Sequence, residues 1–338
     1  MTAAAPRLVE AEDTSLDMIA PFLEPIRPLL YAEDISEIMI NPNGKVFYEQ
    51  DGELLECCWL RAPLDQDDLI EAGKAIARPA LDFGLHHPIV DAILPDGSRV
   101  AAMYPGCAVG GVGLTIRKFR RNWFSVDELV ANGMLAPEAA DILRAAIRDG
   151  RNILLSGGTG TGKTTVQKAL IDCVPDNERL VIIEDSPELK IDRANAFRCV
   201  AQREVWGAND KLIAAGVTLR TLVKASLRHR PDRIVIGEVR DAEAFDLVDA
   251  MNTGHRGSIS TIHANSPRQA LSRLASLSLR ARLEMRYADL LLEVGHVVEI
   301  VAQIERVGPR RRVAAIDEVR GYNPERGRFR MKRVWGGV

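Results

Sequence analysis

The sequence is poor in cysteine and nearly balanced in charge, and both features exclude classes of protein. It has five cysteines in 338 residues, without a CxxC pair, so neither a zinc site nor a disulfide framework is expected. Lys and Arg number 44 and Asp and Glu number 47, which gives a net charge of −3. The chain therefore lacks the overall positive field that non-specific nucleic-acid binding requires. The cysteines are expected to be buried, reduced thiols.

Long apolar runs are absent as well. The longest stretch without a charged residue, 100–116, is broken by one proline and four glycines and is shorter than a bilayer-spanning helix. The amino terminus carries acids where a secretory signal would carry a basic and then an apolar region. With 46% hydrophobic and 27% charged residues, the chain is expected to be a globular protein of the cytoplasm with about two domains.

The amino-terminal part of the sequence predicts a small α+β domain. Residues 1–30 mix acids with four prolines and are expected to form an extension with one helix. The turn pairs Asp51-Gly52 and Asp96-Gly97 predict two β-hairpins, and residues 64–77 between them have helical spacing. We expect this domain to span residues 31–121.

The segment RKFRRN, residues 117–122, stands where this domain joins the next one. It carries three arginines and a lysine, which is typical of a solvated linker. After it, Ser125 and Glu128 have the spacing of a capping box that opens a helix. A second helix is predicted at Pro137–Arg148, where the apolar residues recur with helical period.

The remaining residues, 122–338, predict an α/β domain. Short continuous apolar runs alternate with segments of helical spacing, as in a parallel sheet that is buried on both faces. The four runs are Asn152–Leu155, Leu180–Ile183, Ile234–Ile236 and Ser258–Ile262. Near the carboxyl end, Val313–Val319 and Arg328–Trp335 predict a hairpin.

A glycine-rich segment after the first run, GGTGTGKT, fits the phosphate-binding pattern GxxxxGK[ST] between a strand and a helix. In such a loop the backbone amides and the amino end of the helix bind the α- and β-phosphates. Lys163 is expected at the β- and γ-phosphates and Thr164 at Mg²⁺. The residues predicted to bind the nucleotide are Gly157, Gly158, Thr159, Gly160, Thr161, Gly162, Lys163, Thr164 and Thr165.

Carboxylates follow the second and third apolar runs. Glu184, Asp185 and Glu188 come after the second run, and Glu238 comes after the third. Because ligands of an open parallel sheet bind at the carboxyl ends of its strands, these acids are expected to converge on the nucleotide. They could hold Mg²⁺ or polarise the attacking water, or they could be solvated acids at strand ends. The third run lacks the final aspartate that commonly anchors the metal, and has Gly237 there instead.

Two histidines flank the fourth run. His255 and His263 are eight residues apart, which is not the spacing of a helical metal pair, so zinc is not expected. An even separation along one strand would place both side chains on one face, with His263 near the phosphates and His255 at the start of the strand. The competing interpretation is a pair of packed or solvated histidines.

Taken together, these motifs resemble those of the secretion-superfamily ATPases, the hexameric motors of type IV secretion, conjugation and pilus assembly. The segments that carry the resemblance are GGTGTGKTT, IIEDSPEL, RPDRIVIGEVRDAEAFDLVDAMNTGH and GSISTIHANSPRQAL, and before them SEIMINPNGKVFYEQDGEL, PIVDAILPDGSRVAA and LTIRKF. The likeness covers about residues 30–320 and is greatest to the conjugal-transfer branch, followed by the tight-adherence pilus branch. It implies a RecA-like P-loop NTPase core with a smaller α+β amino-terminal domain.

The resemblance also implies roles for single residues. The segment from Glu184 to Glu188 is similar to the family's Asp box, whose last glutamate is regarded as catalytic, and Glu238 matches the Walker B glutamate. His255 and His263 match the His box. The predicted catalytic residues are Lys163, Glu184, Glu188, Glu238 and His263, and the predicted Mg²⁺ ligands are Thr164, Asp185 and Glu238.

Arginines of the amino-terminal domain reach the nucleotide in this family. Arg117 and Arg120 are therefore candidates for nucleotide binding here, and Arg240 is a further one. The charge at the γ-phosphate would then be complete only when two domains or two subunits close on ATP. On this interpretation the RKFRRN segment is a sensor of the nucleotide and not only a linker.

The implied function is an ATP-hydrolysing motor of a type IV secretion, conjugative transfer or pilus assembly system, with ATP and Mg²⁺ as cofactors. The implied partners are a homo-hexamer and inner-membrane secretion or pilus proteins. We expect a cytoplasmic protein at the periphery of the inner membrane, without direct nucleic-acid binding.

Two alternatives stay open. The first is a binding module that holds ATP, does not hydrolyse it and switches partners. The second is a hexameric helicase-like motor that nucleic acid stimulates. The final 38 residues bear on the second alternative, because they hold ten Lys or Arg and four Asp or Glu. They could meet nucleic-acid phosphates or an anionic membrane surface, or form an ordinary solvated hairpin.

Overall fold

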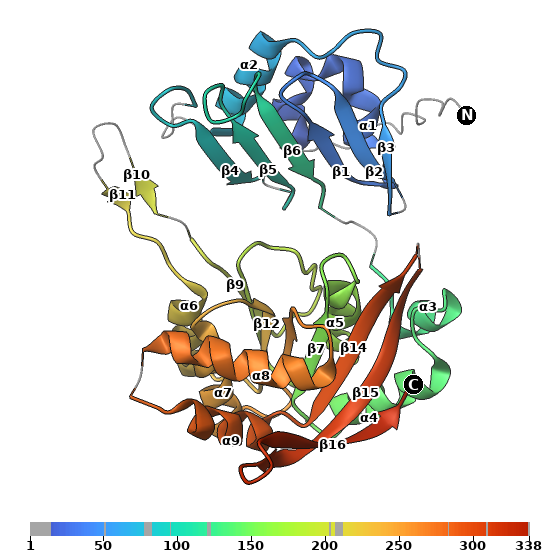
Figure 1. The fold of residues 1–338 in the computed structure, drawn as a ribbon, viewed down its shortest axis with the longest axis vertical. Helices are drawn as coiled ribbons and strands as arrows, with labels where there is room; N and C mark the ends of the chain where they lie inside the picture. The colour runs from blue at the N-terminus through green and yellow to red at the C-terminus, as the bar shows by residue number, and fades with distance from the viewer. Residues whose placement is uncertain are drawn as a thin grey trace. The chain divides into compact units, whose positions relative to one another are not determined.

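The computed structural model describes residues 15–50, 52–77, 83–94, 96–119, 123–202, 204–206, 212–282, 284–308 and 310–336. Contacts divide the chain into two units, one of residues 1–121 with 204–215 and one of residues 122–203 with 216–338. Each unit has its own sheet and its own hydrophobic core (Figure 1). Among the described residues, no helix combines the length and the apolar character needed to cross a bilayer.

The first unit is built on a six-stranded antiparallel sheet with the order β3-β2-β1-β6-β5-β4. Its strands are β1 (Ile35–Ile40), β2 (Val46–Gln50), β3 (Glu53–Glu56), β4 (Ile89–Ile93), β5 (Arg99–Met103) and β6 (Gly113–Arg117). Helices α1 (Arg27–Tyr31) and α2 (Gln66–Ala77) pack on this sheet. The two predicted hairpins are confirmed as β2–β3 and β4–β5, although Asp51 itself lies outside the described residues.

The expected extension over residues 1–30 is wrong for the part that the structure describes. Residues 15–26 form three 3-10 turns, Ser15–Met18, Ala20–Phe22 and Glu24–Ile26, which lead into α1. Leu16, Ile19 and Leu23 are buried in the core of the first unit. Prolines at every third or fourth position stop a continuous α-helix from forming, while the apolar residues between them still face the sheet.

The RKFRRN segment begins as an anchored part of the first unit and not as a solvated linker. Arg117 ends β6 with an exposed side chain. Lys118 donates from Nζ to the carbonyl of Leu29 at 3.3 Å and to that of Ala32, and the backbone N–H of Phe119 donates to Ser98 Oγ at 3.0 Å. Residues 120–122, and with them the predicted domain boundary, lie outside the described ranges.

The second unit contains an eight-stranded sheet with the order β16-β15-β14-β7-β13-β12-β8-β9. The strands from β14 to β9 are parallel, and β15 and β16 extend the sheet as an antiparallel hairpin. The strands are β7 (Ile153–Gly157), β8 (Leu180–Glu184), β9 (Ala196–Val200), β12 (Arg233–Val239), β13 (Ile259–Ile262), β14 (Ile300–Val307), β15 (Arg310–Asn323) and β16 (Arg328–Trp335).

Helices cover both faces of this sheet (Figure 1). They are α3 (Val126–Ala131), α4 (Pro137–Arg148), α5 (Lys163–Ile171), α6 (Leu219–Ser226), α7 (Glu243–Asn252), α8 (Pro267–Ser278) and α9 (Tyr287–Val297). The capping box is confirmed, because Ser125 Oγ accepts from the N–H of Glu128 while the Glu128 carboxylate accepts from the N–H of Ser125. The predicted helix at Pro137–Arg148 is α4 without any shift of its ends.

Several elements were not predicted. Strands β9 and β14 have no counterpart among the predicted apolar runs, and β15 is twice as long as expected. A short hairpin of β10 (Val205–Trp206) and β11 (Leu212–Ala214) groups by contacts with the first unit. The expectation that all cysteines are buried is wrong, since Cys58 and Cys107 are exposed; all five are free thiols.

Candidate active site

The glycine-rich loop joins β7 to α5, as its sequence predicted. Gly160 and Gly162 have φ angles of 69° and 94°, values that residues with a Cβ rarely adopt. Gly162 is the N-cap of α5 and makes no side-chain cap, so the first N–H groups of that helix point into the loop without a partner inside the helix. The loop therefore presents backbone donors and the positive end of a helix, which together suit a phosphate group.

Lys163 is held at the centre of this loop. Its Nζ donates to the carbonyls of Gly157 at 3.1 Å and Gly158 at 2.8 Å, and lies 3.3 Å from Nδ1 of His263. Burial lowers the pKa of Lys163, and the charge of Glu238 opposes that effect. Three acceptors thus surround the ammonium group, which orients it at the carboxyl end of β7.

His263 links Lys163 to Glu238. The histidine follows β13, and its Nε2 lies 2.5 Å from Oε1 of Glu238, which stands on the neighbouring strand β12. Because an ammonium can only donate, Nδ1 must accept from Lys163, so the proton of a neutral ring sits on Nε2 next to Glu238. Burial lowers the pKa of His263, which favours this neutral form. The loop that carries Lys163 and the segment that carries His263, 100 residues apart, therefore meet at the carboxyl ends of the strands.

Arg240 completes the group of charges. Its guanidinium donates to Oε2 of Glu238 at 2.5 Å and lies 3.8 Å from the carboxylate of Asp185. The charge of Glu188 acts on both basic groups: it weakly opposes the burial that lowers the pKa of Lys163, and it adds to the effect of Glu238 and Asp185 that raises the pKa of Arg240. The structure thus brings together five of the predicted residues at the carboxyl ends of β8, β12 and β13.

Glu184 occupies a different position from the other acids. Its side chain is 3% exposed, and its Oε1 accepts from the backbone N–H groups of Glu188 and Leu189 at 2.9 and 2.8 Å. Arg198 contacts the other oxygen at 3.3 Å. The carboxylate thus holds the turn that carries Glu188, and the catalytic role of Glu184 stays a prediction.

Gly237 explains why β12 lacks the expected aspartate. A Cβ at this position would lie in van der Waals contact with Cγ of Glu184, at 3.4 Å, so an aspartate here would bring a second carboxylate close to the buried one. Glu184 on β8 and Gly237 on β12 therefore lie side by side, and the glycine leaves room for the glutamate side chain.

One predicted residue of this unit, His255, is not brought to this group. His255 precedes β13. The start of β13 lies beside the start of β7, so His255 is at the amino ends of the strands, opposite the loop. Its Nδ1 lies 3.2 Å from the carbonyl of Ala250, a local contact that favours a structural role. Arg117 lies in the first unit, exposed on β6, and Arg120 lies outside the described residues. A nucleotide contact by either arginine stays a prediction.

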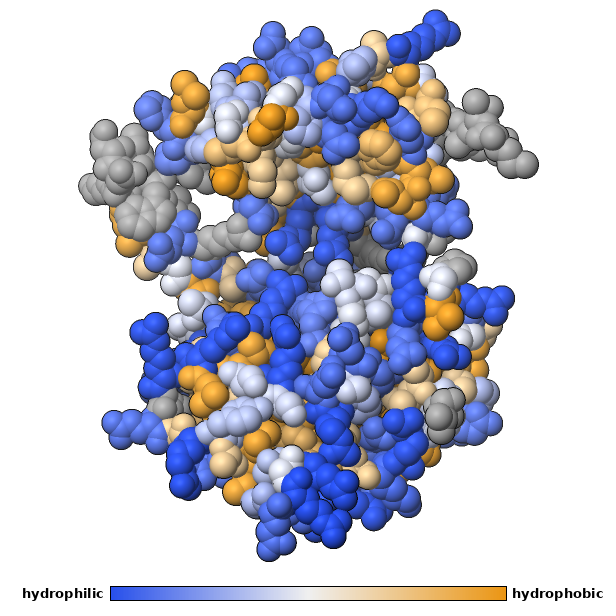
Figure 2. Space-filling view, viewed as in Figure 1, coloured by the Kyte–Doolittle hydropathy of each residue, from blue (hydrophilic) through white to orange (hydrophobic). Residues whose placement is uncertain are grey.

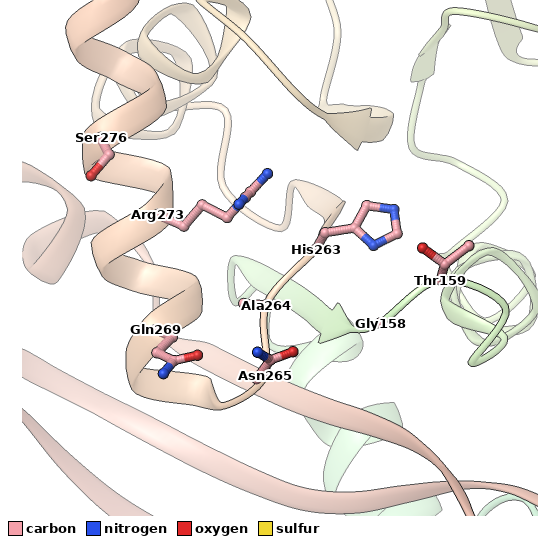
Figure 3. Close-up of a pocket in the computed structure, with 8 residues that line it drawn as sticks. All are labelled: Gly158, Thr159, His263, Ala264, Asn265, Gln269, Arg273 and Ser276. Atoms are coloured by element: carbon pink, nitrogen blue, oxygen red, sulfur yellow. The ribbon is translucent and has the colours of Figure 1, made fainter.

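A cavity beside the loop holds residues that the motifs did not indicate (Figure 3). Its volume is about 620 Å³, and it is lined by Gly158, Thr159, His263, Ala264, Asn265, Gln269, Arg273 and Ser276. Three of the new residues recur on α8 at spacings of four and three, which places them on one face of that helix. The recurrence of polar residues at helical spacing shortly after His263 was the feature of the sequence that could have indicated this cavity wall.

The oxygen atoms around the loop fit a magnesium ion bound together with nucleotide. Mg²⁺ at phosphates takes one or two protein oxygens and completes its shell with phosphate and water. Among the described residues no group of three or more His, Cys, Asp or Glu could hold a metal by itself. Oε1 of Glu238 is buried without a well-directed hydrogen bond from the described residues, and Thr164 begins α5 at the loop.

Comparison with known proteins places the chain among relatives of similar length. The family model for type II/IV secretion system proteins matches residues 19–318. The conjugal transfer protein TrbB of Rhizobium radiobacter is 35% identical over 294 residues, 85% of this chain and 84% of the relative. The type IV secretion system protein VirB11 of Brucella suis is 34% identical over 288 residues, 77% of each chain.

A solved structure supports the fold. The ATPase DotB of Legionella pneumophila superposes with a TM-score of 0.60 at 20% identity, over 95% of this chain and 84% of that one. At this identity the likeness shows the fold alone. It confirms the predicted class, a RecA-like core with an amino-terminal domain.

Proposed function

This chain belongs to the type II/IV secretion system protein family, as its motifs predicted, and we propose that it is an ATP-hydrolysing motor of a conjugal-transfer or type IV secretion system. The names of its relatives support the system. The observation that carries the activity is the contact series from Lys163 through His263 to Glu238 beside the glycine-rich loop. A loop that only bound nucleotide would not need these groups at its open side.

In the proposed reaction, a water oxygen forms a bond to the γ-phosphorus while the bond from that phosphorus to the bridging oxygen of ADP breaks. The water gives up a proton to a carboxylate. Glu188 is the better acceptor, because Glu238 already contacts both Arg240 and His263. Among the described residues, by contrast, the Glu188 carboxylate has no hydrogen bond or ion pair of its own. Backbone N–H groups of the loop and Lys163 hold the leaving phosphates.

Thr164, Glu238 and Asp185 are the residues proposed to hold Mg²⁺, directly or through water. When bound, the ion would neutralise charge on the β- and γ-phosphates. Glu238 would keep its position through Arg240, which is bound to it on one side and lies near Asp185 on the other. Arg240 is thereby an orienting residue whose own charge still acts at the site.

We further propose a homo-hexameric ring at the cytoplasmic face of the inner membrane, where it contacts secretion-machinery proteins. Apolar surface supports an assembly of this kind. Figure 2 shows hydrophobic residues on the surface of both units, and on the first unit Leu85, Val109 and Ile89 are 82%, 92% and 60% exposed. Arg117, and Arg120 with it, would then complete the γ-phosphate charge from another domain or subunit.

The structure of the basic carboxyl-terminal hairpin gives less support to a helicase-like motor than the charge count of its sequence did. Arg333 is paired with Asp317 and Arg320 with Glu318 inside the hairpin, so part of the positive charge is already neutralised. Stimulation of ATP hydrolysis by single-stranded DNA that weakens steeply with salt would favour the helicase-like motor. Stimulation by anionic lipid vesicles alone would favour the membrane-associated motor.

ATP turnover of the purified chain and of Lys163→Ala tests the activity itself. We expect the wild type to release phosphate from ATP and the variant to lose at least about a hundredfold of that rate, as removal of one preorganised donor does. Mass determination with and without ATP tests the ring in the same samples. A wild type that binds ATP without any turnover would instead identify a nucleotide-dependent binding module.

A further inference from the structure

The cavity lined by α8 and the loop extends beyond the group of residues that would perform hydrolysis. His263 stands between the two, since it contacts Lys163 on one side and lines the cavity on the other. Figure 3 shows Arg273 reaching from α8 toward the side of His263, while Asn265 and Gln269 lie near each other at the other end. Thr159, at the turn of the loop, closes the side opposite α8.

The walls of this cavity are held in place. The carbonyl of Ala264 accepts from Ser156 Oγ at 3.4 Å and from Gln303 Nε2 at 3.3 Å, which anchors the residue after His263 to β7 and β14. Ser266 caps α8 through its contact with the N–H of Gln269. The polar side chains of α8 therefore face the loop from a fixed helix and not from a flexible segment.

Charge in the cavity has one sign. Its lining includes Arg273 and no aspartate or glutamate. Arg273 is exposed and makes no ion pair or hydrogen bond within the described ranges, and its charge reaches His263, whose pKa it helps to lower. Arg240, in contrast, is already bound to Glu238. A guanidinium with free donors, next to two amide side chains, suits a small oxyanion.

We propose that this cavity receives the inorganic phosphate formed by hydrolysis, with Arg273 as its main ligand and Gln269 and Asn265 as further donors. Its place next to Gly158, Thr159 and His263, on the open side of the loop, is where the cleaved γ-phosphoryl group leaves. The proposal rests on the proposed ATPase function. It makes phosphate departure a step that α8 controls, separate from bond cleavage at the loop.

Phosphate binding to the oligomer loaded with Mg²⁺ and ADP tests the proposal directly. In equilibrium dialysis with radiolabelled inorganic phosphate, the wild type should bind, and Arg273→Ala should bind about tenfold or more weakly, because a charge-assisted bidentate contact is lost. Arg273→Lys should fall between them. Arg286→Ala is the matched control, because Arg286 is an exposed arginine paired only locally with Asp289. Equal phosphate affinity in wild type and Arg273→Ala would overturn the proposal.

A kinetic measurement separates this site from the γ-phosphate subsite of ATP. Cleavage is followed by acid quench and release by a fluorescent phosphate-binding reporter in a single turnover. The proposal predicts that the delay between cleavage and release shortens about tenfold in Arg273→Ala. If affinity for a non-hydrolysable ATP analogue falls as much as affinity for phosphate, Arg273 contacts the substrate and the proposal is wrong.

Two further outcomes keep the proposals distinct. A wild type that binds phosphate through Arg273 but never cleaves ATP would contradict the ATPase function and leave the anion site standing. A lower oligomer mass of Arg273→Ala than of Arg286→Ala would mean that a neighbouring subunit fills the cavity, and the phosphate site would be abandoned.

Discussion

Replacing Glu184 by glutamine tests how the buried acid supports the active site. Its carboxylate is 3% exposed and accepts from two backbone N–H groups and from Arg198. These donors favour the charged form, whereas burial disfavours it. Burial has the larger effect, and it raises the pKa of Glu184 from 4.5 to about 7. Glutamine has nearly the same shape and keeps one oxygen for the two N–H groups, but it does not titrate.

The sign of the pH effect follows from this shift. Because the folded state binds the proton more tightly than the unfolded state, the stability contributed by Glu184 is fully present below pH 4.5 and is lost as the pH rises through about 7. At about 1.4 kcal/mol per unit, the whole effect is on the order of 3 kcal/mol. Relative to the wild type, Glu184→Gln should therefore become more stable as the pH rises from 5 to 8.

Urea unfolding of both proteins at several pH values between 5 and 8 measures this difference. Intrinsic tryptophan fluorescence reports on both units, since Trp59 lies in the first and Trp123 and Trp335 lie in the second, and amide circular dichroism reports on the whole chain. Glu184→Ala is the companion variant, since it removes the acceptor of both N–H groups and should be less stable at every pH. A stability difference between wild type and Glu184→Gln that does not change with pH would mean that the three donors balance burial, and would refute this reasoning.

Three other substitutions or treatments have defined outcomes. Arg233→Met should destabilise the second unit by about 3 kcal/mol in thermal or urea unfolding, the low end for a broken buried ion pair. The low end applies because Arg233 is 2% exposed while its partner Glu178 is 26% exposed. An unchanged unfolding midpoint would contradict this prediction. Gly162→Ala should lower nucleotide affinity, measured by calorimetry, at least tenfold, since φ of Gly162 is +94° and the new Cβ would lie 2.6 Å from Cε of Met134. Gly160→Ala is the control for backbone strain alone, because no atom lies within 4 Å of a Cβ there. Chelation of Mg²⁺ by EDTA should abolish ATP turnover while circular dichroism stays unchanged, and retained turnover would exclude the proposed role of Glu238.

The parts of the fold that local patterns determine were predictable from the sequence. The capping box at Ser125 and the glycine-rich loop depend on residues only a few positions apart, and both have the predicted geometry. The buried parallel strands β7, β8, β12 and β13 were visible as apolar runs because both of their faces are covered, whereas β14 was not predicted although its first five residues are buried too. Strand β9 escaped notice because it lies at the sheet edge and has no fully buried residue.

The site was only partly predictable, because tertiary contacts decide what each acid does. Glu184 and Glu188 are both acids of one motif, yet the carboxylate of Glu184 is buried under the turn, while the charge of Glu188 acts on Lys163 and Arg240. His255 and His263 share a motif but lie at opposite ends of the parallel strands. One precedes β13 and the other follows it, and β13 runs parallel to β7. Arg273 carried no motif, and only the position of α8 against the loop makes it a candidate ligand.

The central claim is that a carboxylate at the end of β8 turns nucleotide binding into hydrolysis. The most direct test is ATP turnover and ATP affinity of Glu188→Gln beside the wild type. The account predicts that the variant binds ATP with wild-type affinity and loses about a hundredfold or more of the rate, in the range for removal of a general base. Wild-type turnover in Glu188→Gln would contradict it and would transfer the role of base to Glu238.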